Sequence, residues 1–107
     1  MTLQPGSFYV FGGSAYAGGH PADQSFTAGL AAAGGGVALR DGDGSVVDSV
    51  GWGTATNAFV EGTPTAAPAT TAAPGTSAAR LPNGHDTNDN SADFGAATPP
   101  TPKASNS

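Results

Sequence analysis

The stretch GVALRDGDGSVVDSVGWG, from Gly36 to Gly53, decides the fold class of this chain. Two runs rich in β-branched and apolar residues, 36–40 and 45–50, flank Asp41-Gly-Asp-Gly44, whose Asp-Gly pairs supply the positive φ angles of a tight turn. Apolar side chains alternate along the first run, which is typical of a strand with one apolar face. The stretch therefore predicts a β-hairpin, and Trp52, which stands between two glycines behind it, is expected to cap a core.

Shorter strands are expected on both sides of the hairpin. Residues 6–11 (GSFYVF) are aromatic and β-branched and lie between Pro-Gly and Gly-Gly turn signals, while 25–27 and 77–81 are weaker candidates. No helix of three turns is supported, because the three alanines 31–33 stand between glycines and are too few to nucleate one. The sequence therefore predicts an all-β chain.

The composition allows only a small core. Leu, Val, Phe and Ile together make up 15 of the 107 residues, below the rough 20% floor of folded chains. Residues 63–76 contain only Thr, Pro, Ala and Gly and are expected to form an irregular, low-complexity loop. We expect one domain over residues 3–95 and a disordered tail over 96–107, which carries three prolines.

The charge balance excludes several classes of partner. The net charge is −5 and the basic residues are Arg40, Arg80 and Lys103, too few to neutralise several phosphates, so we expect no nucleic-acid binding by the chain on its own. The sequence has no apolar run of the roughly 20 residues that span a bilayer, and residues 1–5 lack the features of a signal peptide. The absence of cysteine excludes disulfides and thiolate metal sites.

The acidic stretch HDTNDNSADF, residues 85–94, is the strongest candidate for a metal site. A calcium loop needs Gly at its sixth position and a bidentate carboxylate at its twelfth, but counting from Asp86 places Ser91 and Ala97 there. No framed nucleophile and no zinc ligand set stands out either. We therefore expect no metal, no cofactor and no catalytic residue, and a protein that is not an enzyme.

Several pieces of the chain, taken in order, resemble the later strands of a bacterial lamin tail domain of the secreted type. These pieces are LQPGSFYVF (3–11), GGVALRD (35–41), DGSVVDSVGWG (43–53), SAAR (77–80), DTNDNSADF (86–94) and PTP (100–102). The resemblance covers residues 3–102 and implies an immunoglobulin-like β-sandwich. The family's opening strands, with D-x-V-E-L-x-N and L-x-G-W elements, would precede Met1, so the resemblance implies a domain truncated at its N-terminus. Because lost strands leave backbone groups unpaired and one face of the core uncovered, we expect the isolated chain to be marginally stable or to need a partner strand.

The resemblance also implies a function and a set of structural residues. It implies a non-catalytic binding or scaffolding module, extracellular or at the cell surface, that attaches or positions a secreted or surface protein through an unknown protein or cell-surface partner. In this interpretation Asp86, Asn90 and Asp93 cap backbone turns, with Arg80 as an ion partner, and Phe94 fills the core. The full structural signature is Asp48, Trp52, Arg80, Asp86, Asn90, Asp93 and Phe94.

Two alternatives remain open for the function. The carboxylates of residues 85–94 keep a calcium-dependent surface module in view. The aromatic residues Tyr9, Tyr16 and Trp52 allow a carbohydrate-binding accessory domain, in which their rings would stack on sugars.

Overall fold

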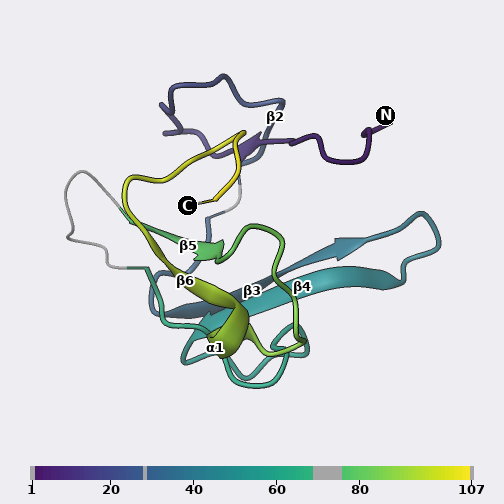
Figure 1. Cartoon of the computed structure of the whole chain (residues 1–107), viewed down its shortest axis with the longest axis vertical. Coiled ribbons are helices and arrows are strands. Elements are labelled where there is room, and N and C mark those ends of the chain that lie inside the picture. Colours follow the sequence, from purple (N-terminus) through teal and green to yellow (C-terminus); the bar gives the residue numbers. More distant parts are fainter. Residues whose placement is uncertain (1, 28, 69–75, 107) are drawn as a thin grey trace.

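The computed structural model describes residues 2–27, 29–68 and 76–106. Over these residues the chain forms short strands and one helical turn, which follow the sequence as β1 (Phe11–Gly12), β2 (Gln24–Ser25), β3 (Gly34–Arg40), β4 (Val46–Gly53), β5 (Ser77–Arg80), α1 (Asn90–Asp93) and β6 (Phe94–Ala97). The strands pair as β1–β2, β3–β4 and β5–β6, each pair a sheet of its own (Figure 1). The all-β prediction is confirmed, and the described residues show three two-stranded sheets.

The predicted hairpin is confirmed as β3 and β4, which pair antiparallel. In the turn, the Asp41 carboxylate accepts hydrogen bonds from the Asp43 and Ser45 backbone N–H groups, both at 3.1 Å. Gly44 has a φ of +90°, a conformation that glycine adopts without the steric cost other residues meet. The tight turn is therefore confirmed, but the positive φ predicted for both Asp-Gly pairs is found at Gly44 and not at Gly42.

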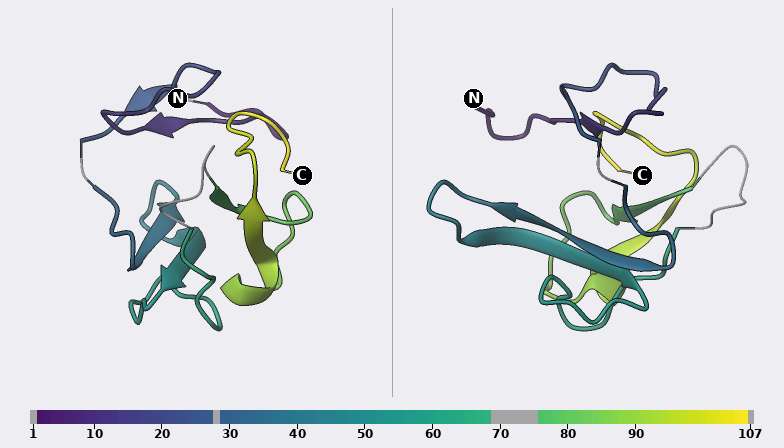
Figure 2. Two further views of the ribbon diagram at one scale, coloured as in Figure 1. Left: turned by 90° about the vertical axis from the view of Figure 1, so that its left-hand side faces the viewer. Right: turned by 180° about the vertical axis from the view of Figure 1, so that it is seen from behind.

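One face of the hairpin is apolar over most of its length. The register places Val37 opposite Val50, Leu39 opposite Asp48 and Gly35 opposite Trp52, so these side chains share a face. The turn end of the hairpin extends past the other elements (Figures 1 and 2). As a result Val37 and Leu39 remain 44% and 59% exposed.

The second antiparallel pair, β5 with β6, corrects the expected domain boundary. The strand expected at 77–81 is confirmed as β5, and its partner β6 continues to Ala97. Ala97 is only 2% exposed because it lies in the ladder opposite Ser77. The residues after β6 also make contacts, since the Asn106 amide donates to the Arg80 carbonyl at 3.1 Å. β6 therefore continues past the expected boundary at residue 95, and the disorder expected for the rest of the tail stays a prediction.

The N-terminal strand is shorter than the sequence predicts. Of the expected region 6–11, only Phe11 is in β1, which pairs parallel with β2. The preceding residue, Val10, hydrogen-bonds through its N–H to the Asp23 carboxylate at 2.8 Å, so a side chain takes the place of a strand partner. β1 and β2 form a separate layer above the rest of the chain (Figure 2).

The interior of the described chain is more polar than apolar. The buried hydrophobic residues are Ala79 and Ala97, whereas the buried polar residues are Ser49, Thr65, Asn90 and Asp93. Hydrogen bonds rather than apolar packing therefore join the elements. No helix among the described residues is long and apolar enough to cross a membrane.

Candidate binding site

The buried side chain of Asn90 connects α1 to the outer edge of β4. Its Oδ1 accepts the Gly51 N–H at 2.9 Å, and its Nδ2 donates to the Ser49 carbonyl at 3.3 Å. The same Oδ1 accepts the Glu61 N–H at 2.9 Å, and the Asn90 backbone N–H donates to the Glu61 carbonyl at 2.7 Å. Asn90 is fully buried, so these bonds satisfy its polar groups in the absence of water.

Thr65 continues this edge and corrects the expectation for residues 63–76. Its N–H donates to the Gly51 carbonyl at 3.0 Å and its carbonyl accepts the Gly53 N–H at 2.8 Å. Thr65 is 4% exposed, although the sequence predicts a loop that buries almost nothing. Residues 69–75 of this loop lie outside the described residues. Thr65 and the Asn90 side chain thus act as a short third strand beside β4.

The helical turn α1 is held by two carboxylates. Asp89 is its N-cap and accepts hydrogen bonds from the Ser91 N–H at 3.1 Å and the Thr63 N–H at 3.2 Å. Asp93 is fully buried and accepts from the Thr87 N–H at 2.8 Å and the Thr87 hydroxyl at 2.7 Å. The pKa of Asp89 is lowered first by the hydrogen bond from the Ser91 hydroxyl, 2.9 Å long, and then by the backbone bonds. Burial is the largest single influence on Asp93 and raises its pKa, but the hydrogen bonds from Thr87 and other groups outweigh it and lower the pKa.

Arg80 of β5 stands at the centre of a group of carboxylates. Its guanidinium lies 2.6 Å from Asp48 Oδ1 and 3.6 Å from both Asp86 Oδ1 and Asp93 Oδ2. It also lies 4.6 Å from the centre of the Phe94 ring, in a cation–π arrangement. The Arg80 side chain is only 12% exposed, so these contacts compensate for removing its charge from water.

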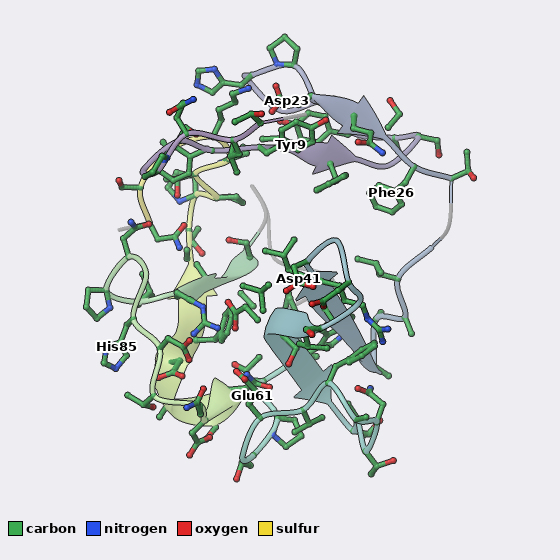
Figure 3. All side chains as sticks on the ribbon, turned by 90° about the vertical axis from the view of Figure 1, so that its right-hand side faces the viewer. Tyr9, Asp23, Phe26, Asp41, Glu61 and His85 are labelled. Atoms are coloured by element: carbon green, nitrogen blue, oxygen red, sulfur yellow. The ribbon has the colours of Figure 1, made fainter. Side chains whose placement is uncertain are left out.

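Glu61 adds a further carboxylate beside this group. Asp48, Glu61 and Asp86 each offer an oxygen atom, and these three atoms lie within 4.8 Å of one another. Glu61 Oε1 is buried and has no hydrogen-bond partner among the described residues. Burial raises the pKa of Glu61, and the neighbouring Asp48 and Asp86 carboxylates raise it further. Figure 3 shows Glu61 between β4 and the α1–β6 segment.

This acidic group forms an ion-pair network with Arg80. The Arg80 guanidinium contacts Asp48 and Asp86 directly, so it supplies the positive charge that a bound cation would bring. Its hydrogen bond to the His85 carbonyl, 2.7 Å long, further fixes it in place. The arrangement joins β4, β5 and the loop before α1.

An apolar cleft of about 510 Å³ lies beside the network, between β4 and the β5–β6 pair. Trp52 and Val50 line it from β4, and Phe94 lines it from β6. Ala31 lies on the rim, where its carbonyl accepts the Trp52 indole N–H at 2.9 Å. That bond fixes the indole, and the cleft can take an apolar group. The described residues that line it bring no acid–base or nucleophile–base pair together.

The structure brings most of the predicted signature residues together. Asp48, Arg80, Asp86 and Asp93 join in the ion-pair network, and Phe94 packs against Arg80. Two more signature residues contact or belong to β4: Asn90 bonds to Gly51 of this strand, and Trp52 of the strand lines the cleft. Phe94 is half-buried at the wall of the cleft, which differs from a side chain that fills a closed core.

The aromatic platform expected for sugar binding does not assemble. Tyr9 packs on Phe11, with 5.0 Å between ring centres, and lies in the β1–β2 layer (Figure 3). Tyr16 donates its hydroxyl to the His20 carbonyl at 2.7 Å. Trp52 is therefore the one member of this set that lines the apolar cleft.

Sequence reasoning missed Glu61, Thr65 and Thr87. Glu61 and Thr65 carry no local signal, because their roles depend on partners placed by the fold. The N-cap residue Asp89 was also missed, although it had a local signal, since Asp is a preferred residue at the start of a helix. The His85 side chain is 41% exposed, and its Nε2 lies 3.6 Å from Asp93 Oδ1.

No protein-family model, no curated protein and no solved structure matches this chain. The resemblance to the lamin tail domain is carried by the sequence motifs alone and stays a prediction.

Proposed function

We propose that the chain is a non-catalytic binding module of the lamin tail type, which attaches or positions a secreted or surface-associated protein. The observation that supports this function is the apolar cleft between β4 and the β5–β6 pair, with Trp52 and Phe94 in its walls. Aromatic side chains in a concave apolar site are typical anchors for a partner's side chain. An extracellular or cell-surface location, and the full immunoglobulin-like sandwich, belong to the same proposal.

The occupant of the cleft is an apolar side chain from an extended segment of a partner protein. The cleft volume, about 510 Å³, falls within the range of roughly 300–1,000 Å³ typical of ligand sites. The walls present alanine and aromatic groups and few polar atoms, which favours an apolar anchor over a sugar hydroxyl. The net charge of −5 favours a segment with basic residues beside that anchor.

Selection of peptides displayed on phage tests this function. We expect the purified chain to enrich peptides with one large apolar residue, and their binding to change the Trp52 emission. Leu30→Arg places a charge on the exposed rim of the cleft and should abolish binding, while Val47→Lys, an exposed change on β4 away from the cleft, should not. Selected peptides that bind both variants equally would contradict the proposal.

Titrations of the purified chain with calcium and with oligosaccharides test the two alternative functions. A calcium-dependent module would release or absorb heat on calcium addition, and the heat would vanish in Asp86→Ala. A carbohydrate-binding domain would show quenching of Trp52 emission by oligosaccharides and no effect of the peptides. We expect neither response, because Arg80 already contacts the carboxylates and the cleft walls are apolar.

A further inference from the structure

The backbone of β3 presents an edge of unpaired groups to solvent. On β4, Gly51 directs its N–H and Ser49 its carbonyl outward to the Asn90 side chain. Residues opposite each other in an antiparallel pair direct their groups the same way, either toward each other or toward opposite outer edges. Gly36 lies opposite Gly51 and Ala38 opposite Ser49, so both direct their N–H and carbonyl groups to the outer edge of β3.

The hydrogen bond at the start of the hairpin agrees with this phase. Thr54 donates its N–H to the Ala33 carbonyl at 3.1 Å, so the backbone carbonyl of Ala33 points toward the β4 side of the hairpin. The backbone groups of Gly34, the next residue, therefore point to the outer edge of β3. Among the described residues no backbone group pairs with this edge. β3 lies on the side of the hairpin away from β5 and β6 (Figure 2), which leaves the edge accessible.

Apolar side chains are exposed directly beside this edge. Val37 is 44% and Leu39 59% exposed, and they share the apolar face of the hairpin. An accessible edge next to exposed apolar side chains is a template for another strand. One added strand would pair the backbone of β3 and cover both side chains.

We propose that a second copy of this chain supplies that strand, with the two β3 strands antiparallel about a two-fold axis at Val37. In this register Gly36 of one copy pairs with Ala38 of the other, and each such pair exchanges both backbone hydrogen bonds. Leu39 falls opposite Gly35 of the second copy, and Arg40 opposite its Gly34. The large side chains at one end of β3 therefore lie next to glycines. The Trp52 ring covers Gly35 on its own chain, so Leu39 of the second copy would meet an apolar surface there.

The charge distribution also favours the antiparallel arrangement. The hairpin turn carries the exposed carboxylates of Asp41 and Asp43. Antiparallel pairing places the two turns at opposite ends of the interface, beside the uncharged alanines 31–33 of the other copy. Parallel pairing would bring the four carboxylates together, and their repulsion would oppose association. This dimer uses the β3 edge and does not depend on the binding function of the cleft.

Disulfide trapping tests the register directly, because the chain has no cysteine of its own. In the proposed dimer Val37 and its copy form a pair without hydrogen bonds, with Cα atoms about 4.5 Å apart, within the range for a disulfide. Val37→Cys should therefore give a covalent dimer on mild oxidation. Leu39→Cys is the matched control, since its two copies are separated by four residues along the strand, roughly 13 Å. Equal cross-linking of the two variants, or none, would overturn the proposal.

A proline substitution on the outer edge of β3 gives a second test of the dimer. Ala38→Pro removes an N–H that points away from β4, so the hairpin should form while the dimer edge loses a donor. Sedimentation equilibrium of the unmodified chain should show a reversible monomer–dimer equilibrium, with a dissociation constant at least about tenfold weaker in Ala38→Pro. Circular dichroism checks that this variant keeps the hairpin, and its Val37→Cys double variant should lose the cross-link. An unmodified chain that stays monomeric up to about 1 mM would overturn the dimer.

Discussion

The Asn90 side chain binds Gly51 as the backbone of a neighbouring strand would, with Oδ1 2.9 Å from the Gly51 nitrogen. The amide of Asn90 therefore extends the short edge pairing that Thr65 makes with β4. One buried side chain replaces a peptide unit of a third strand. In a chain with two buried apolar residues among those described, such a bond carries a large share of the stability.

Replacement of Asn90 should be among the most damaging substitutions in the chain. Asn90→Ala leaves the Gly51 and Glu61 N–H groups and the Ser49 carbonyl without their partner. Each buried group left unpaired costs roughly 1–3 kcal/mol, so we expect a loss of about 3 kcal/mol or more in the free energy of unfolding. Urea denaturation followed by circular dichroism measures it.

Asn88→Gly is the matched control for this change. Asn88 is exposed and has a φ of +60°, so glycine removes an amide without backbone strain. We expect its stability to stay within about 0.5 kcal/mol of the unmodified chain. Equal losses in the two variants would show that the Asn90 bonds contribute little.

Gly53 should not tolerate a side chain. Its φ is +63°, and a Cβ atom there would lie 1.9 Å from the Ala33 carbonyl oxygen. Gly53→Ala should therefore destabilise the chain by more than about 2 kcal/mol, since the clash is with backbone. Gly42→Ala, whose Cβ would meet no atom within 4 Å, should have little effect. Thermal unfolding of the pair checks the prediction, and a Gly53→Ala variant as stable as Gly42→Ala would contradict the register of the hairpin.

The positive charge of Arg80 should matter more than that of Arg40. Arg80→Met leaves Asp48, Asp86 and Asp93 without their common cation. Since the Arg80 side chain is only 12% exposed, we expect a loss of roughly 2–4 kcal/mol in the free energy of unfolding. Arg40→Met removes an exposed charge near the Phe59 ring and should cost less than about 1 kcal/mol. Equal losses in urea denaturation would count against the network.

The local parts of the fold could be predicted from the sequence. The hairpin follows from the Asp-Gly pairs at 41–44 and the runs that flank them, and each signal lies within a few residues of the structure it specifies. β5 could be predicted for the same reason. The single turn α1 has a local N-cap signal in Asp89, but a pattern of four residues is too short to distinguish a helical turn from a loop.

The long-range parts could not be predicted. Asn90 bonds to residues 29 and 41 positions away in the sequence, and Lys103 forms an ion pair with Asp23, 80 positions away. Composition measures the apolar area that a segment can bury, so it predicts these polar segments to be irregular. They are held instead by side-chain hydrogen bonds, which composition does not show. The resemblance to the lamin tail motifs predicts Arg80 as an ion partner of the carboxylates at 86–93, but the Asp48–Arg80 pair has no signal in the sequence.

The pKa of Glu61 gives a test by pH. Burial and the nearby Asp48 and Asp86 carboxylates raise the pKa of Glu61 in the folded chain. A raised acid pKa means that the folded state favours the uncharged form of Glu61. The stability that this preference contributes is fully present below the pKa of the unfolded chain and is lost as the pH rises through the pKa of the folded chain. Glu61→Gln keeps the uncharged shape at every pH. Its free energy of unfolding relative to the unmodified chain should therefore rise as the pH increases from the ordinary Glu pKa, about 4.3, through the raised pKa of Glu61. A difference that is constant with pH, measured by urea denaturation, would contradict the burial of the Glu61 carboxyl group.

Nuclear magnetic resonance titration of the labelled chain with a phage-selected peptide tests the central claim, a non-catalytic module that binds through its apolar cleft. The account predicts that the largest shift changes fall on Val50, the Trp52 indole N–H, Ala78 and Phe94, which line the cleft. The turn residues Asp41 and Asp43 should change little. Shift changes centred on Asp48, Glu61 and Asp86, or changes absent from the cleft residues while the peptide binds, would contradict it.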